Sequence, residues 1–297
     1  MSGLLANRVA IITGAGRGLG RTHALAMARS GARVVVNDLD AEAARQVCYE
    51  ITRAGGEASS NHANVQDLKQ VQDMAAETLQ RWGQVDILVN NAGILRDKTF
   101  AKIDLTDFRL VLDVHLMGSV HCTHAVWAHM KERGYGRVIF TASSSGLYGN
   151  FGQSAYSAAK MALVGLMQTL ALEGARYGIH VNCLAPSAST QMTDTILKPE
   201  DLQALEARRV SPAVVALASE AAPNKQIVLA GAGSFEQSHI TMTQGLYLAD
   251  EELSAERILE NWERLGDRAG EFVPAAGWDQ CQFEVARARE HDSRRGE

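Results

Sequence analysis

Short runs of consecutive apolar residues, many of them β-branched, alternate with longer stretches of helix-favouring residues through most of the chain. Strands that are apolar on both faces are typical of a parallel sheet covered by helices on both sides. The pattern therefore predicts a doubly wound α/β fold of the Rossmann type with a parallel sheet of seven strands. The runs expected to form these strands are residues 8–13, 32–37, 58–62, 86–90, 137–141, 179–184 and 226–230. The longest helices are expected at residues 41–54, 67–82, 106–133 and 154–177.

The alternation ends after Gly233, which predicts a single domain over residues 1–233 and a C-terminal extension over residues 234–297. Within the extension one amphipathic helix is expected at residues 254–265, followed by extended chain around Trp278 and a charged, frayed end. The apolar stripe of this helix has two interpretations, packing within the extension or contact with a substrate cleft or a second subunit. The stripe consists of Ile258, Leu259, Trp262 and Leu265.

Composition and charge narrow the classes of partner. Of the 297 residues 46% are hydrophobic, and the mean hydropathy of −0.11 fits a soluble globular protein. The net charge is −5 and no internal basic block occurs, which disfavours nucleic acid as a partner. No apolar run reaches about 18 residues and the N-terminus lacks a signal-peptide pattern, so no membrane association is expected. Four cysteines without C-x-x-C spacing favour free thiols in a reducing cytoplasm, which is the expected location.

A glycine-rich turn between the first strand and the next helix is the first candidate binding site. Gly14, Gly18 and Gly20 form the pattern G-x-x-x-G-x-G, with Arg17 and Leu19 between them. Such a turn lets a pyrophosphate approach the backbone N–H groups of a helix N-terminus. The spacing differs from the G-x-G-x-x-G fingerprint, and glycines like these also occur in ordinary turns.

Asp38, which closes the second strand, strengthens the case for a dinucleotide. A carboxylate there accepts hydrogen bonds from the adenosine ribose hydroxyls and repels a 2′-phosphate, which favours NAD as the cofactor. Arg17 gives the opposite indication because a guanidinium can bind a 2′-phosphate. Asp38 could also serve only as a helix N-cap or turn residue, and that role is compatible with ribose binding.

Tyr156 and Lys160 are the candidate catalytic pair. Their spacing of four places both on one face of a predicted helix. A phenol titrates near pH 10, and a fixed ammonium beside it is expected to lower the pKa of Tyr156 so that the phenolate acts as a base. Ser143 follows the strand at residues 137–141 and is expected to hold the reacting oxygen. A tyrosine and a lysine at this spacing are more often a half-exposed pair in solvent; Ser143 and the glycine-rich turn favour chemistry.

Together these motifs resemble the short-chain dehydrogenase/reductase family over residues 5 to 233. The matching segments are Thr13–Gly20, Asp38, Asn90–Gly93, Ser143, Tyr156 with Lys160, and Ala185 with Pro186. The resemblance implies transfer of a hydride between NAD(P) and a secondary alcohol, with Tyr156 taking the hydroxyl proton and Lys160 binding the nicotinamide ribose. It also implies cofactor contacts at Asn64 and Val65 beside the adenine, at Asn91, Ala92 and Gly93 along the cofactor, and at Pro186, Ala188 and Thr190 beside the nicotinamide.

A closer resemblance is to the (3R)-hydroxyacyl-CoA dehydrogenase domain of peroxisomal multifunctional β-oxidation enzymes, a group also classed as 17β-hydroxysteroid dehydrogenases. The segments that carry it include Asn37–Leu39, Gly93–Lys98 and Ser145–Gln153. It implies (3R)-3-hydroxyacyl-CoA as the substrate, with a hydroxysteroid or other alicyclic alcohol as the alternative. His115 stands where most family members carry an Asn that supports a proton-relay water, and is expected to connect Lys160 to solvent. A nucleotide-sensing scaffold that has lost its chemistry is the non-enzymatic alternative.

The expected partners are a small-molecule alcohol or ketone, including a CoA thioester, and further copies of the chain. Arg96, Lys98 and Lys102 either meet CoA phosphates or form a solvated loop. A homodimer or homotetramer is expected through the apolar helices at residues 106–133 and 154–177. His121, His124 and His129 lack a carboxylate or Cys that would complete a ligand set, so no metal is expected.

Overall fold

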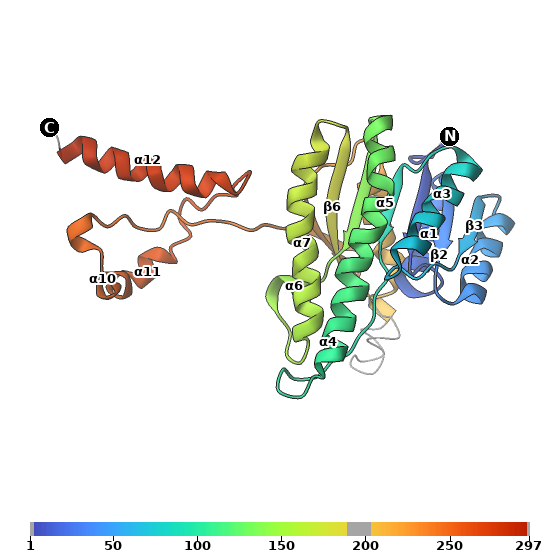
Figure 1. Ribbon diagram of the computed structural model, residues 1–297, viewed down its shortest axis with the longest axis horizontal. Helices are drawn as coiled ribbons and strands as arrows, with labels where there is room; N and C mark the ends of the chain where they lie inside the picture. Colours follow the sequence, from blue (N-terminus) through green and yellow to red (C-terminus); the bar gives the residue numbers. More distant parts are fainter. Residues whose placement is uncertain (1–2, 189–202, 296–297) are drawn as a thin grey trace. The chain divides into compact units, whose positions relative to one another are not determined.

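The computed structural model describes residues 3–188 and 203–295 of the chain. The first part of the chain is built on an eight-stranded sheet in the order β3-β2-β1-β4-β5-β6-β7-β8, of which β1 to β7 run parallel. Figure 1 labels β2, β3 and β6 of this sheet. The strands are β1 (Val9–Thr13), β2 (Arg33–Asn37), β3 (Glu57–Asn61), β4 (Ile87–Asn90), β5 (Gly136–Thr141), β6 (Ile179–Ser187), β7 (Ile227–Gly231) and β8 (Ser234–Ser238). The doubly wound fold is therefore confirmed, and the seven predicted strands are found with most ends shifted by one residue.

An eighth strand, β8, which was not predicted, extends the seven predicted parallel strands at the edge of the sheet. Ala232 and Gly233, with φ of 52° and 88°, turn the chain back on itself between β7 and β8. Two central residues with positive φ are the mark of a tight antiparallel hairpin. The sequence gives little sign of β8, because its residues are mostly exposed and lack an alternation of apolar and polar positions.

Helices cover both faces of the sheet and bury two separate cores. The helices of this part of the chain are α1 (Gly18–Arg29), α2 (Ala41–Arg53), α3 (Leu68–Trp82), α4 (Leu105–Leu112), α5 (Gly118–Arg133), α6 (Ser144–Tyr148), α7 (Ser154–Ala175) and α9 (Ser211–Ala218). On β5, Val138 and Phe140 belong to the core shared with α3, α5 and α7. Ile139 between them belongs to the core shared with α1, α2 and α9. Successive side chains of a strand point to opposite faces, so strands buried on both faces are apolar throughout.

The helix expected at residues 106–133 is interrupted by one π-helical turn at Asp113–Met117, between α4 and α5. This turn carries His115, which is 2% exposed. π-Turns inside α-helices are rare and occur often at functional sites. Nothing in the apolar periodicity of the sequence indicates this interruption.

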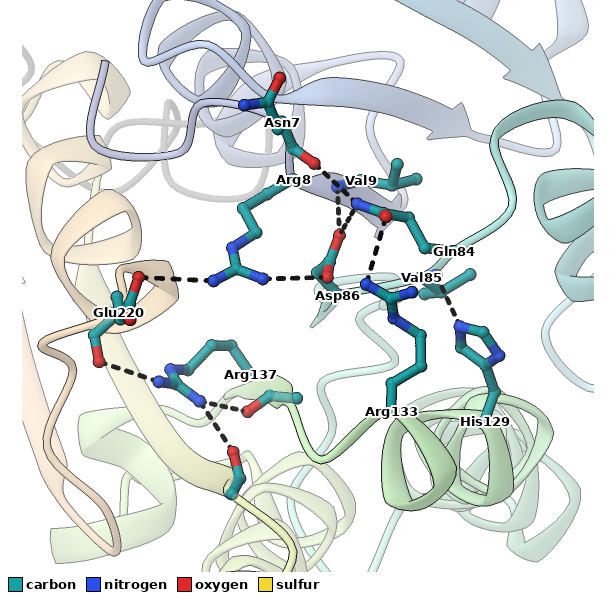
Figure 2. A network of polar contacts seen from close by, with 12 residues as sticks. Asn7, Arg8, Val9, Gln84, Val85, Asp86, His129, Arg133, Arg137 and Glu220 are labelled. Carbon is teal, nitrogen blue, oxygen red and sulfur yellow. Dashed lines mark hydrogen bonds and ion pairs between the residues drawn. The ribbon is translucent and has the colours of Figure 1, made fainter. Parts of the chain in front are cut away.

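A polar network lies at the amino ends of β1, β4 and β5 (Figure 2). Buried Asp86 accepts from the backbone N–H of Val9 at 2.8 Å and from Arg8 Nη1 at 3.3 Å. Arg137, 4% exposed, donates to four backbone carbonyls at 2.7–3.0 Å. These carbonyls belong to Gly136, Gly178, Ser219 and Glu220. The network ties β5, the start of β6 and the end of α9 together, a stabilising role that the sequence analysis did not predict.

Helix α7 is long and apolar enough to cross a membrane by length and composition, with a mean hydropathy of 1.2 over its most apolar window. Its Leu163, Val164, Met167 and Ala171 are instead buried in the core beside β5 and β6. A buried helix of a globular protein meets the same test of length and composition. The composition of α7 is therefore explained by its packing.

The chain divides into two compact units, Met1–Gln237 and Ser238–Glu297, a boundary four residues later than the one predicted after Gly233. The second unit contains α10 (Ala255–Glu260), α11 (Trp262–Leu265) and α12 (Trp278–Arg295). The predicted amphipathic helix is thus broken at Asn261. The extended chain predicted for residues 272–278 is found at residues 272–274 but was wrong at Trp278, and the frayed end predicted from Arg287 was wrong over its described part. Residues 278–295 form a helix rich in Ala, Arg, Glu and Gln, which favour helices.

Few side chains of the second unit are buried within it. Among its described residues Ala249 alone is buried. Within the predicted apolar stripe, Leu259 and Trp262 are 68% and 64% exposed. The stripe therefore does not form a core inside this unit.

Candidate active site

The loops that follow β1 and β4 meet at the carboxyl edge of the sheet, where the strand order changes direction. Asn91 Nδ2 donates to the carbonyls of Thr13 and Gly14 at 3.0 Å each. The Thr13 hydroxyl accepts from the backbone N–H groups of Asn91 and Ala92, also at 3.0 Å. In open α/β sheets ligands bind in the crevice at this switch point. Asn91 therefore fixes the glycine-rich turn from the neighbouring strand.

Two glycines in this turn are required by the local geometry. Gly14 has a φ of +61°, and a Cβ there would lie 2.8 Å from the Cα of Ala92. A Cβ on Gly20 would lie 2.1 Å from the carbonyl oxygen of Gly14. The turn and the start of α1 therefore pack closely, leaving backbone rather than side chains along the crevice.

Asp38 lies at the end of β2 with its carboxylate held by the backbone. Its Oδ2 accepts from Gly16 N–H at 2.9 Å and its Oδ1 accepts from Asp40 N–H at 3.0 Å. Asp40, and not Asp38, is the N-cap of α2. The capping role considered for Asp38 therefore belongs to its neighbour, and Asp38 remains at the cavity as a ribose-binding candidate.

Ser143, Tyr156 and Lys160 come together from β5 and α7. Ser143 follows β5 and caps the short helix α6, accepting from Ser145 N–H at 3.2 Å. Lys160 Nζ donates to the backbone carbonyl of Thr141 at 2.5 Å and lies 5.4 Å from the centroid of the Tyr156 ring. Ser143 and Lys160 are 8% and 3% exposed. The three side chains thus meet in a site that is largely shielded from water.

The pKa of Tyr156 is raised from its ordinary value and not lowered as expected from Lys160. Burial raises the pKa of Tyr156, a hydrogen bond with the Ser143 side chain opposes that rise, and the charge of Asp97 adds to it. Burial also lowers the pKa of Lys160 to about 7. The physical reason is that the ammonium is itself desolvated, so part of its charge is lost at neutral pH. The sequence placed the pair correctly and did not account for burial.

His115 faces the same site from the π-turn. Its Nε2 lies 3.0 Å from Ile94 N and 2.8 Å from Ile94 O, and its ring packs edge-on against Tyr156 at 5.3 Å. Its Nδ1 is buried and has no hydrogen-bond partner among the described residues. Burial, followed by the charge of Lys160, lowers the pKa of His115 to about 3, so the ring is neutral. A neutral imidazole with an unpaired nitrogen can bond a water or a ligand.

A cavity of about 880 Å³ contains these groups. The predicted residues that line it are Gly14, Arg17, Gly18, Leu19, Gly20, Asp38, Asn64, Val65, Asn91, Ala92, Gly93, His115, Ser143, Tyr156, Lys160, Pro186 and Ala188. Thr190 lies outside the described residues. Asn64 Oδ1, expected to accept from an adenine amine, here accepts from Gln66 N–H at 3.0 Å.

Several other residues that line the cavity were not predicted to have a role. Gln153 Nε2 donates to Asp97 Oδ2 at 2.7 Å, and both side chains line the cavity beside Tyr156. Gln153 precedes Tyr156 by three residues, a helical spacing that could have drawn attention to it. The carbonyl of Thr141, which holds Lys160, could not have been found, since a backbone group carries no sequence signal.

Two of the three histidines considered as metal ligands, His121 and His129, bond the backbone. His121 Nδ1 lies 2.9 Å from Val65 O, and His129 Nε2 accepts from Val85 N–H at 3.3 Å. Within residues 3–188 and 203–295 no group of three or more His, Cys, Asp or Glu side chains is arranged to hold a metal ion.

The residues present fit a dinucleotide. The cavity volume lies within the usual range for cofactor sites, about 300–1,000 Å³. The glycine-rich turn offers a close backbone approach at a helix N-terminus, and the Asp38 carboxylate stands beside it. Thr141 Oγ1 and His115 Nδ1, at residues lining the opposite part of the cavity, are buried polar atoms without a partner in the described chain.

Comparison with known proteins agrees with this arrangement. The family model described as short chain dehydrogenase matches residues 8–201. The mouse peroxisomal multifunctional enzyme type 2 is 42% identical over 280 residues, which cover 90% of this chain and 38% of that protein. The chain thus spans well under half the length of that relative.

Solved structures extend the comparison. The full-length peroxisomal multifunctional enzyme type 2 of Drosophila melanogaster matches with a TM-score of 0.81 and 36% identity, covering 96% of this chain and 50% of that one. A short chain dehydrogenase of Mycobacterium avium matches with a TM-score of 0.79 and 36% identity, covering 90% of this chain and 97% of that one.

More distant structures carry different cofactors. A 7α-hydroxysteroid dehydrogenase complexed with NADH and 7-oxo glycochenodeoxycholic acid is 29% identical, with a TM-score of 0.73 over 80% of this chain and 98% of that one. A gluconate 5-dehydrogenase of Burkholderia cenocepacia in complex with NADP and tartrate is 31% identical, with a TM-score of 0.72 over 77% of this chain and 95% of that one. Family members therefore bind NAD or NADP. The matched motifs, the switch-point cavity and these comparisons together show that the chain belongs to the short-chain dehydrogenase family.

Proposed function

We propose that the protein is an NAD-dependent dehydrogenase that interconverts a secondary alcohol and its ketone, with (3R)-3-hydroxyacyl-CoA and 3-oxoacyl-CoA as the leading substrate pair. The observation that carries the proposal is that Ser143, Tyr156 and Lys160 line the same cavity as the glycine-rich turn and Asp38. One end of the cavity thus suits a dinucleotide and the other suits acid–base chemistry.

The nicotinamide cofactor supplies the hydride acceptor when it is bound, and its oxidised ring adds a positive charge to the site. Tyr156 removes the hydroxyl proton of the alcohol, and Ser143 donates a hydrogen bond to the same oxygen as it becomes a carbonyl. Lys160, held by the Thr141 carbonyl, favours the phenolate in proportion to its own charge. His115 remains in its expected role between Lys160 and solvent, in which its buried, unpaired Nδ1 would bond a relay water. Proton transfer by a positioned side chain contributes about 10²–10⁴-fold to the rate.

Asp38 supports NAD over NADP as the cofactor. Its oxygens are fixed by the backbone N–H of Gly16, in the glycine-rich turn, and by that of Asp40, so the carboxylate cannot easily turn away from a 2′-phosphate. Bringing the Asp38 carboxylate and a 2′-phosphate together in a site shielded from water would cost free energy, because both are negatively charged. Replacing Asp38 by Ala is expected to relax the preference for NAD.

A CoA thioester is favoured as the substrate by the matched segments near the cavity and by the similarity to multifunctional peroxisomal enzymes. Lys98 and Lys102 are exposed on the loop that precedes α4 and could meet CoA phosphates, whereas Arg96 is paired with Asp107. A hydroxysteroid is the second candidate, supported by the match to a 7α-hydroxysteroid dehydrogenase.

The test is reduction of NAD⁺, followed at 340 nm, with (3R)- and (3S)-3-hydroxyacyl-CoA esters, hydroxysteroids and simple secondary alcohols. Turnover of the (3R) thioester well above the others supports the proposal. Tyr156→Phe is expected to abolish turnover while binding NADH normally, which separates a catalytic role from a folding defect. A wild-type protein that binds NADH and turns over no alcohol would instead support the scaffold alternative.

We also propose a homodimer or homotetramer, in line with the apolar character of α5 and α7. Met161 and Leu172 of α7 are 39% and 51% exposed, and Met117, in the π-turn just before α5, is 39% exposed, which leaves apolar surface for a second copy. Mass measurement of the full chain in solution tests this, and a monomer at micromolar concentration would contradict it.

A further inference from the structure

Arg17, in the glycine-rich turn, is a cation that could attract the 2′-phosphate that Asp38 is proposed to repel. Arg17 lines the cavity next to Asp38 and its side chain is 64% exposed. A guanidinium at such a place suits a phosphate, because it presents parallel N–H donors. If it were free, Arg17 would favour a dinucleotide with a 2′-phosphate and weaken the discrimination by Asp38.

Arg17 is not free, because Nη2 forms an ion pair and hydrogen bond with Asp40 Oδ2. Asp40 is a rigid partner, since its Oδ1 accepts from the backbone N–H groups of Glu42 and Ala43 at 3.1 Å each. The bond from Ala43 N–H, the charge of Arg17 and the bond from Glu42 N–H keep the pKa of Asp40 below its ordinary value. One oxygen of Asp40 therefore caps α2 while the other holds Arg17.

A second arginine of the cavity is restrained in the same way. Arg21, one turn into α1, reaches Glu50 of α2 through Nη2 at 2.5 Å and Nε at 3.3 Å. Both arginines that line the cavity from the glycine-rich turn and α1 thus point to carboxylates at or in α2. Arg17, Asp38 and Asp40 together carry a net charge of −1 beside the expected adenosine ribose.

We propose that Asp40 is a positioning residue for cofactor choice, which holds Arg17 away from a 2′-phosphate and so disfavours NADPH. The inference rests on the proposed function, because it assumes that a dinucleotide binds with its adenosine ribose at Asp38. Asp38 acts on the cofactor directly, whereas Asp40 acts through Arg17. The two residues are linked by the hydrogen bond from the backbone N–H of Asp40 to Asp38 Oδ1.

Asp40→Asn is the informative variant, because Asn caps a helix as well as Asp does and only the charge is lost. The dissociation constants of NADH and NADPH are measured by cofactor fluorescence without substrate. An exposed ion pair of this kind contributes at most a few-fold, so the constant for NADPH is expected to fall about fivefold. The constant for NADH is expected to change less than about twofold.

Two controls separate this role from a change in overall charge. In an Arg17→Ala background, Asp40→Asn is expected to leave the NADPH constant unchanged, because the residue through which it acts is gone. Glu42→Gln removes a charge from the same helical turn but contacts Arg45 and not Arg17, and is expected to have no effect. A fivefold gain that persists without Arg17, or that Glu42→Gln reproduces, would overturn the inference in favour of direct repulsion.

The remaining outcomes are also decisive. If the wild-type protein binds NADH and the Asp40→Asn variant gains no affinity for NADPH, the inference about Asp40 is wrong. The proposed function is not affected by that result. A wild-type protein that binds neither dinucleotide removes the proposed function and the inference together. A wild-type protein that binds NADPH more tightly than NADH shows that neither Asp38 nor Asp40 excludes the 2′-phosphate.

Discussion

Replacing Lys160 by Met should make the cofactor-free protein more stable while it abolishes turnover. Burial lowers the pKa of Lys160 from 10.5 to about 7. One pKa unit corresponds to about 1.4 kcal/mol, so the buried amine lowers stability by about 4 kcal/mol at pH 7. The variant loses the hydrogen bond to Thr141 O, worth about 1–2 kcal/mol. Methionine fills a similar volume in this buried place. The expected net gain in the free energy of unfolding is about 2–3 kcal/mol.

The pH dependence gives the same prediction a second test. The folded pKa of Lys160 is depressed, so its contribution to stability is complete above pH 10.5 and is lost as pH falls toward 7. The stability advantage of Lys160→Met should therefore shrink by up to about 1.4 kcal/mol for each pH unit between 7 and 10.

The assay is urea unfolding of both proteins at pH 7, 8 and 9, followed by far-UV circular dichroism. Lys102→Met, at an exposed lysine, is the matched control and should shift stability by less than about 0.5 kcal/mol. The reasoning would be refuted if Lys160→Met unfolded at a lower urea concentration than the wild type at pH 7. It would also be refuted if the stability advantage of the variant did not change with pH.

Three further predictions concern the network in Figure 2 and the buried histidines. Arg137→Met should lower the free energy of unfolding by about 2–4 kcal/mol, because four carbonyls lose a charged donor. The control Arg133→Met, at an exposed arginine, should change it by less than about 0.5 kcal/mol. Equal effects of the two substitutions in chemical denaturation would contradict this prediction. Gly93→Ala should impair activity and stability, because a Cβ there would lie 2.3 Å from His115 Cε1. Adding His115→Ala should recover part of the lost stability, and additive effects in a double-mutant cycle would count against the clash. Burial lowers the pKa of His23 to about 3, so its contribution to stability is complete above about pH 6.5 and lost as pH falls toward 3. His23→Gln should therefore flatten the slope of stability against pH between 6 and 4 by up to about 1.4 kcal/mol per unit, and an unchanged slope would assign the acid sensitivity to other groups.

The order of strands and helices in the first 231 residues follows from local pattern, because apolar runs on both faces require a covered parallel sheet. The positions of the glycine-rich turn, Asp38, Asn91 and Ser143 follow from the same pattern. Each stands just after a strand, and the carboxyl ends of parallel strands meet at one edge of the sheet. Residues far apart in the sequence could therefore be assigned to one cavity before any coordinates were known.

Prediction from local pattern was least successful where the chain departs from the alternation of buried strands and helices. Strand β8 is a polar edge, and α12 is too charged and exposed to show an apolar stripe, so both were missed. The π-turn that presents His115 was also missed, since one extra residue per turn leaves no trace in a helical periodicity.

The sequence by itself thus determined which side chains gather in the cavity, and the tertiary structure decided their charge and their partners. Lys160 is half titrated near neutral pH because distant strands and helices exclude water from it, a long-range effect that residue spacing does not encode. Arg17 is directed to Asp40 because the packing of α1 beside α2 brings a capping carboxylate within reach of the glycine-rich turn. Spacing along the chain places a residue on an element; burial and pairing depend on how the elements meet.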